Sequence, residues 1–150
     1  LMTYPGLCMA VKNPLQESTS YGMGIDPVGL RVTLRQLWER YHLPLIITEN
    51  GCGVPDTLTE DGKVHDDYRI DYLRRHIQAC REAITDGVDL FGYSPWSAFD
   101  LISTHQGITK RYGFIYVNRD EFDLKDMKRI RKDSFYWYQK VCKSNGKDLG

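Results

Sequence analysis

The stretch Leu45-Ile46-Ile47-Thr48-Glu49-Asn50-Gly51 decides how this sequence folds. It is a short apolar run with β-branched residues, and it follows Pro44, a residue that strands tolerate near their start. Such a run predicts a strand buried on both faces of a parallel sheet. Glu49 stands at the carboxyl end of that strand, the edge at which β/α barrels place their catalytic groups. Position alone leaves open a second interpretation, a solvent-exposed loop carboxylate.

Helices are predicted on both sides of this strand. Asp26-Pro27 is typical of a helix start, because Asp accepts from an unpaired N–H and proline lacks one. Apolar residues at helical spacing predict a second helix from about Asp66 or Asp67 to a cap at Gly87. The apolar stripes comprise Leu30, Leu34, Leu37, Trp38 and Tyr41 in the first helix, and Ile70, Leu73, Ile77, Cys80 and Ile84 in the second.

The remaining segments complete an alternating order. Residues 88–96 predict another strand, residues 112–117 a short extended stretch, and residues 132–144 a last helix, whereas residues 1–25 read as a loop-rich lead-in. Alternation of helix and strand indicates parallel β/α architecture. Two buried parallel strands cannot cover each other, and a closed barrel takes roughly 250 residues. The 150 residues therefore predict either a small open α/β domain or a piece of a larger barrel.

Composition excludes several classes. The chain is 41% hydrophobic and 27% charged, as in ordinary globular proteins. Its 20 basic and 20 acidic residues balance, which argues against nucleic-acid and anionic-membrane partners. No apolar run approaches the roughly 20 residues that span a bilayer. The basic run of Lys125, Lys128, Arg129, Arg131 and Lys132 is interpreted as a solvated surface.

The four cysteines, Cys8, Cys52, Cys80 and Cys142, form no CxxC pair, which argues against a zinc site. Scattered cysteines without a secretion signal are expected to be reduced thiols of a cytoplasmic protein, and a structural disulfide is the alternative. The histidines show no metal-ligand spacing either.

Several motifs in order resemble glycoside hydrolase family 1. The strand that ends in Glu49 is similar to the family's nucleophile strand. The resemblance covers about residues 24–146 and implies the C-terminal portion of a (β/α)8 TIM barrel: the last two barrel strands with their flanking helices, so that residues 1–150 are a partial catalytic barrel. The other matching segments are residues 67–73 with His76 and Ile77, residues 92–100, residues 110–117 and residues 134–138.

The resemblance implies that Glu49 is the nucleophile of a retaining glycosidase. An ionised carboxylate stabilises the oxocarbenium-like transition state and then forms a covalent glycosyl-enzyme. The family places the acid/base in an Asn-Glu dipeptide on an earlier strand, and this chain contains no such dipeptide. The chain alone is therefore expected to be inactive. The family chemistry implies neither a cofactor nor a metal.

The resemblance also implies the substrate-binding residues Trp96, Ser103, Lys110 and Tyr112. Trp96 would lie along the sugar. Plain β-glucosidases of the family carry a Glu at the position of Ser103, whereas the pattern S-x6-K-x-Y is similar to the phosphate clamp of members that act on 6-phosphoglycosides. Two unit charges 4 Å apart at an effective dielectric near 20 interact by about 4 kcal/mol, so a Glu there would repel the phosphate. The alternative is that Ser103 is a turn residue and Lys110 is solvated.

Thr104 stands where phospho-galactosidases of the family tend to carry Trp, and so favours the gluco substrate. The predicted function is hydrolysis of β-glucoside 6-phosphates, phosphorylated disaccharides or aryl glucosides, to glucose 6-phosphate and an aglycone by a cytoplasmic enzyme. The alternatives are a 6-phospho-β-galactosidase, an unphosphorylated β-glucosidase, or a truncated chain that is inactive or only binds sugar phosphates. Unpaired strand edges would favour self-association.

Overall fold

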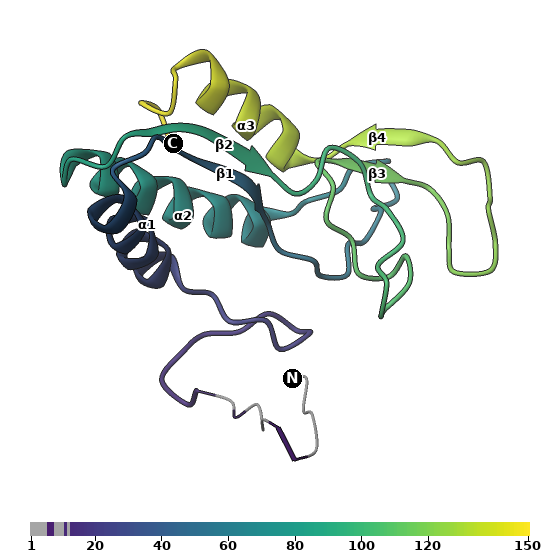
Figure 1. The fold of residues 1–150 in the computed structure, drawn as a ribbon. Coiled ribbons are helices and arrows are strands. Elements are labelled where there is room, and N and C mark those ends of the chain that lie inside the picture. The colour runs from purple at the N-terminus through teal and green to yellow at the C-terminus, as the bar shows by residue number, and fades with distance from the viewer. Residues whose placement is uncertain (1–5, 8–10, 12) are drawn as a thin grey trace.

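The computed structural model describes residues 6–7, 11 and 13–150 of the chain (Figure 1). Residues 13–25 form turns and one isolated bridge between Ser18 and Gly24. The regular elements that follow are α1 (Pro27–Tyr41), β1 (Leu45–Asn50), α2 (Asp67–Thr85), β2 (Leu90–Pro95), β3 (Ile115–Val117), β4 (Arg129–Arg131) and α3 (Asp133–Lys143).

The two longer strands pair in parallel, as predicted. Ile47 of β1 stands opposite Tyr93 of β2, and Asn50 stands opposite Pro95. The short strands β3 and β4 form a separate antiparallel ribbon. Figure 1 shows this ribbon beyond the carboxyl ends of β1 and β2, with long loops between the two sheets. Those loops carry every residue that the sequence assigns to substrate binding.

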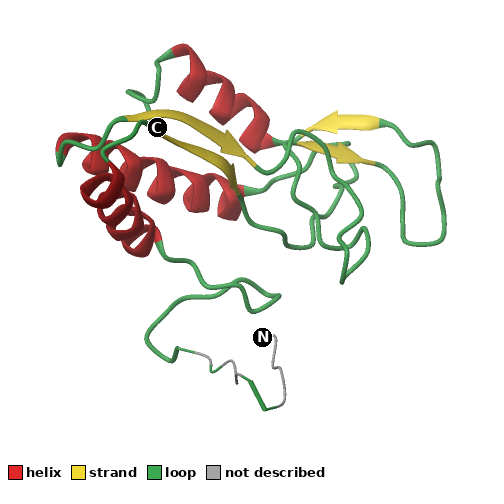
Figure 2. Cartoon of the chain, viewed as in Figure 1, coloured by secondary structure: helices red, strands yellow, loops and turns green. Residues whose placement is uncertain are grey.

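The core lies between the strands and the helices (Figure 2). Leu34 of α1 packs with Ile47 of β1 and with Cys80 and Ala83 of α2. Tyr93 of β2 packs against this cluster and also against a second one. The second cluster joins α2 to α3 through Tyr72, Leu73, Ile77, Phe114 and Val141. The predicted apolar stripe of α1 is only partly buried, since Leu37 and Tyr41 are exposed where α2 does not cover the helix.

The other face of the β1–β2 pair is bare in the described part of the chain. Ile46 lies over Gly92 on this face and keeps 47% of its surface exposed. An apolar β-branched residue in mid-strand is normally covered. Among the described residues, helices cover one side of the sheet and nothing covers the other, as expected for a piece cut from a larger barrel.

The predicted start of α1 is confirmed. Oδ1 of Asp26 accepts a hydrogen bond from the N–H of Gly29 at 2.8 Å, and Pro27 occupies the first turn. His42 adopts a left-handed conformation with φ of 51° and ends the helix before Pro44. Gly87, with φ of +99°, follows the end of α2 as the sequence predicted.

The interpretation of residues 125–132 as a solvated basic surface is wrong in part. Residues 129–131 form β4, and Lys132 is completely buried. Its ammonium lies between two aspartates, which compensate the cost of removing a charge from water. Lys128 and Arg129 are exposed, as expected.

Two further observations concern the described residues. None of their helices is both long enough and apolar enough to cross a bilayer. Cys52, Cys80 and Cys142 are free thiols, the first two buried, and Cys8 lies outside the described residues.

Candidate active site

The carboxyl end of β1 is fixed by Asn50. Its Oδ1 accepts from the Tyr93 hydroxyl at 2.6 Å, and its Nδ2 donates to the Tyr72 hydroxyl at 3.3 Å. Burial raises the pKa of both tyrosines, so both hydroxyls stay protonated. The backbone carbonyl of Asn50 accepts from the N–H of Trp96 at 2.8 Å, which joins the ends of β1 and β2.

A β-bulge directs Glu49 away from the helices. Ile47 and Asn50 both face the helical layer, although they are three residues apart, because Thr48 and Glu49 together stand opposite the single residue Ser94. Strict alternation would place Glu49 on the same face as Ile47. The extra residue breaks the alternation, and bulges serve this purpose beside functional sites. Glu49 is exposed and forms neither a hydrogen bond nor an ion pair with any described residue.

Trp96 lies at the same edge, directly after β2. It is 40% exposed, and its peptide bond to Ser97 is cis. The chain after β1 passes close to it, because a Cβ on Gly51 would lie 2.0 Å from the Trp96 carbonyl oxygen. The fold thus brings the predicted nucleophile and the predicted sugar platform to neighbouring strand ends.

We call residues 103–112 the clamp loop. Ser103 begins this loop, in a turn that closes at Gly107. Ser103 and Gly107 exchange backbone hydrogen bonds of 2.9 and 3.2 Å. The Ser103 hydroxyl is buried and donates to Oε1 of Gln106 at 3.3 Å, within its own turn, and forms no hydrogen bond with Lys110 or Tyr112. Oε2 of Glu121 accepts from the N–H of Ile108 at 2.7 Å and holds the loop from the β3–β4 connection.

Lys110 and Tyr112 are in direct contact. The Lys110 ammonium lies 5.5 Å from the centre of the Tyr112 ring and 5.3 Å from that of Tyr21. Lys110 is only 7% exposed, so it is not the solvated lysine of the alternative interpretation. Gly53 permits this packing, because a Cβ there would lie 2.6 Å from the Tyr112 ring.

A buried ionic network contacts the clamp loop through Arg111. Arg111 donates from Nη1 to Oδ2 of Asp100 at 2.9 Å, and Lys132 lies 2.7 Å from Oδ1 of the same carboxylate. Asp56 joins Lys132, at 2.5 Å, to Arg69, at 3.2 Å. Arg69 also pairs with Asp66, whose Oδ2 accepts from the hydroxyl of Ser134. The network thus contains three cations and three aspartates.

The charges of this network compensate one another. Burial alone would raise the pKa of Asp56, but Arg69 and Lys132 outweigh it and hold that pKa below its ordinary value. The network links the start of α2, the clamp loop and the start of α3. Sequence reasoning named Asp66 only as a helix start and gave no role to Asp56, Asp100 or Arg69, since only the fold brings them together.

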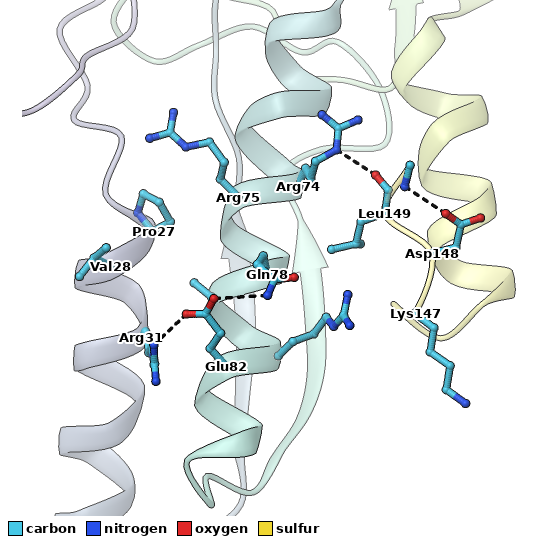
Figure 3. A pocket seen from close by; sticks show the side chains of 13 residues that line it. Pro27, Val28, Arg31, Arg74, Arg75, Gln78, Glu82, Lys147, Asp148 and Leu149 are labelled. Carbon is cyan, nitrogen blue, oxygen red and sulfur yellow. Dashed lines mark hydrogen bonds and ion pairs between the residues drawn. The ribbon is translucent and has the colours of Figure 1, made fainter.

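Two other features lie apart from this edge. No group of three His, Cys, Asp or Glu side chains among the described residues is arranged to hold a metal ion. A surface groove of about 660 Å³ lies between α1, α2 and residues 147–150 (Figure 3). None of the predicted site residues lines it, and Arg31 and Arg74 in its wall already bind Glu82 and the Leu149 carbonyl.

Two parallel strands with helices on one face have the architecture of a piece of a parallel β/α barrel. The chain belongs to glycosyl hydrolase family 1, whose sequence model matches residues 3–147. The prediction of a partial TIM barrel is confirmed by a family 1 β-glucosidase from Thermotoga maritima. That structure superposes with a TM-score of 0.82 at 42% identity, over 91% of this chain and 30% of the other.

The curated relatives of this chain include phospho-glucosidases. The aryl-phospho-β-D-glucosidase BglC of Bacillus subtilis (strain 168) is 56% identical over 145 residues, which are 97% of this chain and 30% of the relative. The 6-phospho-β-glucosidase AscB of Escherichia coli (strain K12) is 48% identical over 141 residues, 93% of this chain and 30% of the relative. The chain therefore spans less than a third of the length of these relatives.

Proposed function

We propose that this chain is the nucleophile-bearing and phosphate-binding part of a retaining 6-phospho-β-glucosidase. The observation that carries the proposal is Lys110, a buried lysine whose ammonium faces two tyrosine rings and no carboxylate among the described residues. A phosphomonoester carries about −1.5 to −2 charges near neutral pH and would supply the missing counter-charge. The names of the two phospho-glucosidase relatives support the same substrate class.

Glu49 is the nucleophile in this proposal. One of its carboxylate oxygens attacks the anomeric carbon while the bond to the aglycone oxygen breaks and that oxygen takes a proton from a second carboxyl group. Water then attacks the same carbon, gives its proton to that second group, and releases Glu49 and glucose 6-phosphate. The second carboxyl group must stand about 5–5.5 Å away, and it comes from the part of the barrel outside this chain.

Trp96 and the clamp loop bind the sugar. The exposed indole of Trp96 offers an apolar face on which a pyranose ring packs. Lys110 provides a point charge and Tyr112 a phenolic donor for the 6-phosphate. Ser103 places no repelling carboxylate at its own position in the clamp loop. Because sugar phosphates arise where import is coupled to phosphorylation, we expect the enzyme to act in the cytoplasm.

The test uses the full-length protein that contains this chain. Lys110→Ala should lower kcat/KM for a β-glucoside 6-phosphate by up to about a thousandfold, the value of a 4 kcal/mol charge interaction. Plain β-glucosides should be cleaved nearly unchanged. Lys128→Ala, at an exposed lysine, is the matched control. An equal loss on both substrates would show that Lys110 is structural.

The same assay separates the alternatives. Faster cleavage of the unphosphorylated glucoside by the wild type would identify a β-glucosidase, and preference for the 6-phosphogalactoside would reverse the inference from Thr104. A reading frame that continues upstream into a barrel with an Asn-Glu dipeptide supports the enzyme. A start codon immediately before Leu1 would instead support a truncated binding module or an inactive remnant.

The bare face of β1 and β2 fits this proposal. In a whole barrel the remaining strands would cover Ile46 and Gly92. We expect the 150-residue chain alone to lack glycosidase activity and to self-associate through its unpaired strand edges.

A further inference from the structure

Lys110 differs from the other buried cations of the described chain. Lys132, Arg69 and Arg111 each lie within ion-pair distance of an aspartate. Lys110 is comparably buried, at 7% exposure, yet no carboxylate of the described residues comes within that distance. A buried charge without a partner is costly, so its surroundings must stabilise it in another way.

Two aromatic faces replace the carboxylate. The ammonium of Lys110 lies 5.3 Å from the ring centre of Tyr21 and 5.5 Å from that of Tyr112, both within the range of cation–π attraction. A ring face attracts a cation but does not neutralise it. The two rings therefore hold the Lys110 side chain without supplying a carboxylate partner, which leaves its ammonium to an incoming anion.

Tyr21 reaches the clamp loop from the segment before α1. Its hydroxyl donates to Oγ1 of Thr109 at 3.3 Å, across 88 positions of sequence, and its side chain is half-buried. It lies outside the S-x6-K-x-Y pattern that predicted the clamp. The two rings reach Lys110 from different parts of the chain, and only Tyr112 belongs to the clamp loop.

We propose that Tyr21 is a positioning residue for Lys110 and thereby contributes to selectivity for a 6-phosphorylated sugar. The inference rests on the proposed phosphate-binding function and extends it to a residue outside the clamp loop. In this view Tyr21 acts through Lys110. Its loss should therefore affect phosphorylated substrates only.

The experiment compares steady-state kinetics of variants of the full-length protein on a matched pair, an aryl β-glucoside and its 6-phosphate. Tyr21→Leu should raise KM for the phosphorylated substrate about tenfold with kcat nearly unchanged, and should leave the plain glucoside unaffected. Tyr21→Phe keeps the ring and should retain most of the selectivity. An equal loss on both substrates, or no loss on either, overturns the proposal.

If Tyr21→Leu does not fold, a second pair of variants keeps the shape of the side chain at position 21 and changes only the electron density of its ring. Trifluorinated phenylalanine at position 21 keeps the shape of phenylalanine but withdraws electron density from the ring face. It should raise KM for the phosphorylated substrate relative to Tyr21→Phe, and equal KM values would refute the role of the ring.

Lys110→Ala separates a failure of the proposed phosphate clamp from a failure of the proposed role of Tyr21. A selective effect of Lys110→Ala without one of Tyr21→Leu refutes only the role of Tyr21. The absence of a selective effect at Lys110 refutes the phosphate clamp itself, and the role of Tyr21 with it.

Discussion

Nζ of Lys132 lies 2.7 Å from Oδ1 of Asp100, and both side chains are fully enclosed. The same carboxylate accepts from Arg111 at 2.9 Å and from the N–H of Gly113 at 3.0 Å. The pair therefore connects the residue before α3 to the loop that carries Lys110. This buried salt bridge therefore lies beneath the predicted phosphate site and links its loop to the start of α3.

Replacement of Lys132 should destabilise the fold strongly. Lys132→Met keeps much of the side-chain volume but leaves the three aspartates of the network with only two cations. Removing one partner of a buried ion pair typically costs about 3–5 kcal/mol. Urea unfolding of the full-length protein should show this loss, whereas Lys128→Met at an exposed position should stay within about 0.5 kcal/mol of the wild type. Similar stabilities of the two variants would contradict the network's role.

The buried His76 predicts a dependence of stability on pH. Burial lowers its pKa below the ordinary 6.5, although its Nδ1–H donates to the Tyr72 carbonyl at 2.7 Å, which opposes the shift. The unfolded chain then binds a proton more readily than the folded one. The contribution of His76 to stability is present above pH 6.5 and is lost as the pH falls towards the folded pKa, by up to about 1.4 kcal/mol per pH unit. His76→Gln should reduce this slope in urea titrations between about pH 5 and pH 7.

The pKa of His65 is shifted in the opposite direction to that of His76. Its Nδ1 lies 2.6 Å from Oδ2 of Asp133, and this hydrogen bond raises its pKa above 6.5. Its contribution is present below pH 6.5 and is lost as the pH rises through the raised pKa. In urea titrations, His65→Gln should therefore lower the free energy of unfolding below pH 6.5. His76→Gln should instead lessen the loss of stability in the same pH range. If both variants shift the pH profile in the same direction, one of the two assignments is wrong.

The parallel strands and the helices were predictable because each carries a local signal. The Asp26-Pro27 start and the apolar run from Leu45 act over a few residues, and the structure confirms both. The face of the sheet on which Glu49 lies was not predictable in this way. It depends on a bulge, which is visible only in the register between β1 and β2.

The buried status of Lys132 and the contact of Tyr21 with Lys110 were also beyond sequence reasoning. A lysine in a basic run is normally solvated, and Lys132 departs from this only because Asp56 and Asp100 converge on it from distant loops. Tyr21 stands in a segment without periodicity, so nothing local relates it to Lys110. Partners that are distant in sequence are the part of this site that required a structure.

A carboxylate in the clamp loop should reverse the substrate preference. Ser103→Glu places a negative charge where we propose that the 6-phosphate binds, and about 4 kcal/mol of repulsion corresponds to a loss near a thousandfold in kcat/KM for phosphorylated glucosides. Ser103→Ala is the matched control, since it removes the hydroxyl without adding charge and should cost about tenfold or less. Comparable losses in both variants would attribute the effect to the Ser103–Gln106 contact rather than to charge.

Removal of the Glu49 carboxylate should abolish turnover and leave the fold unchanged. Its side chain is exposed and bonds to no described residue, so the structure loses no contact in Glu49→Gln. The reaction loses its nucleophile, which we expect to lower kcat by about four orders of magnitude or more. The neighbouring Asn50 is the informative control, because it binds Tyr93 at 2.6 Å and Tyr72 at 3.3 Å. Asn50→Ala should lower the unfolding temperature as well as the activity, whereas a destabilised Glu49→Gln would mean that Glu49 is a structural residue.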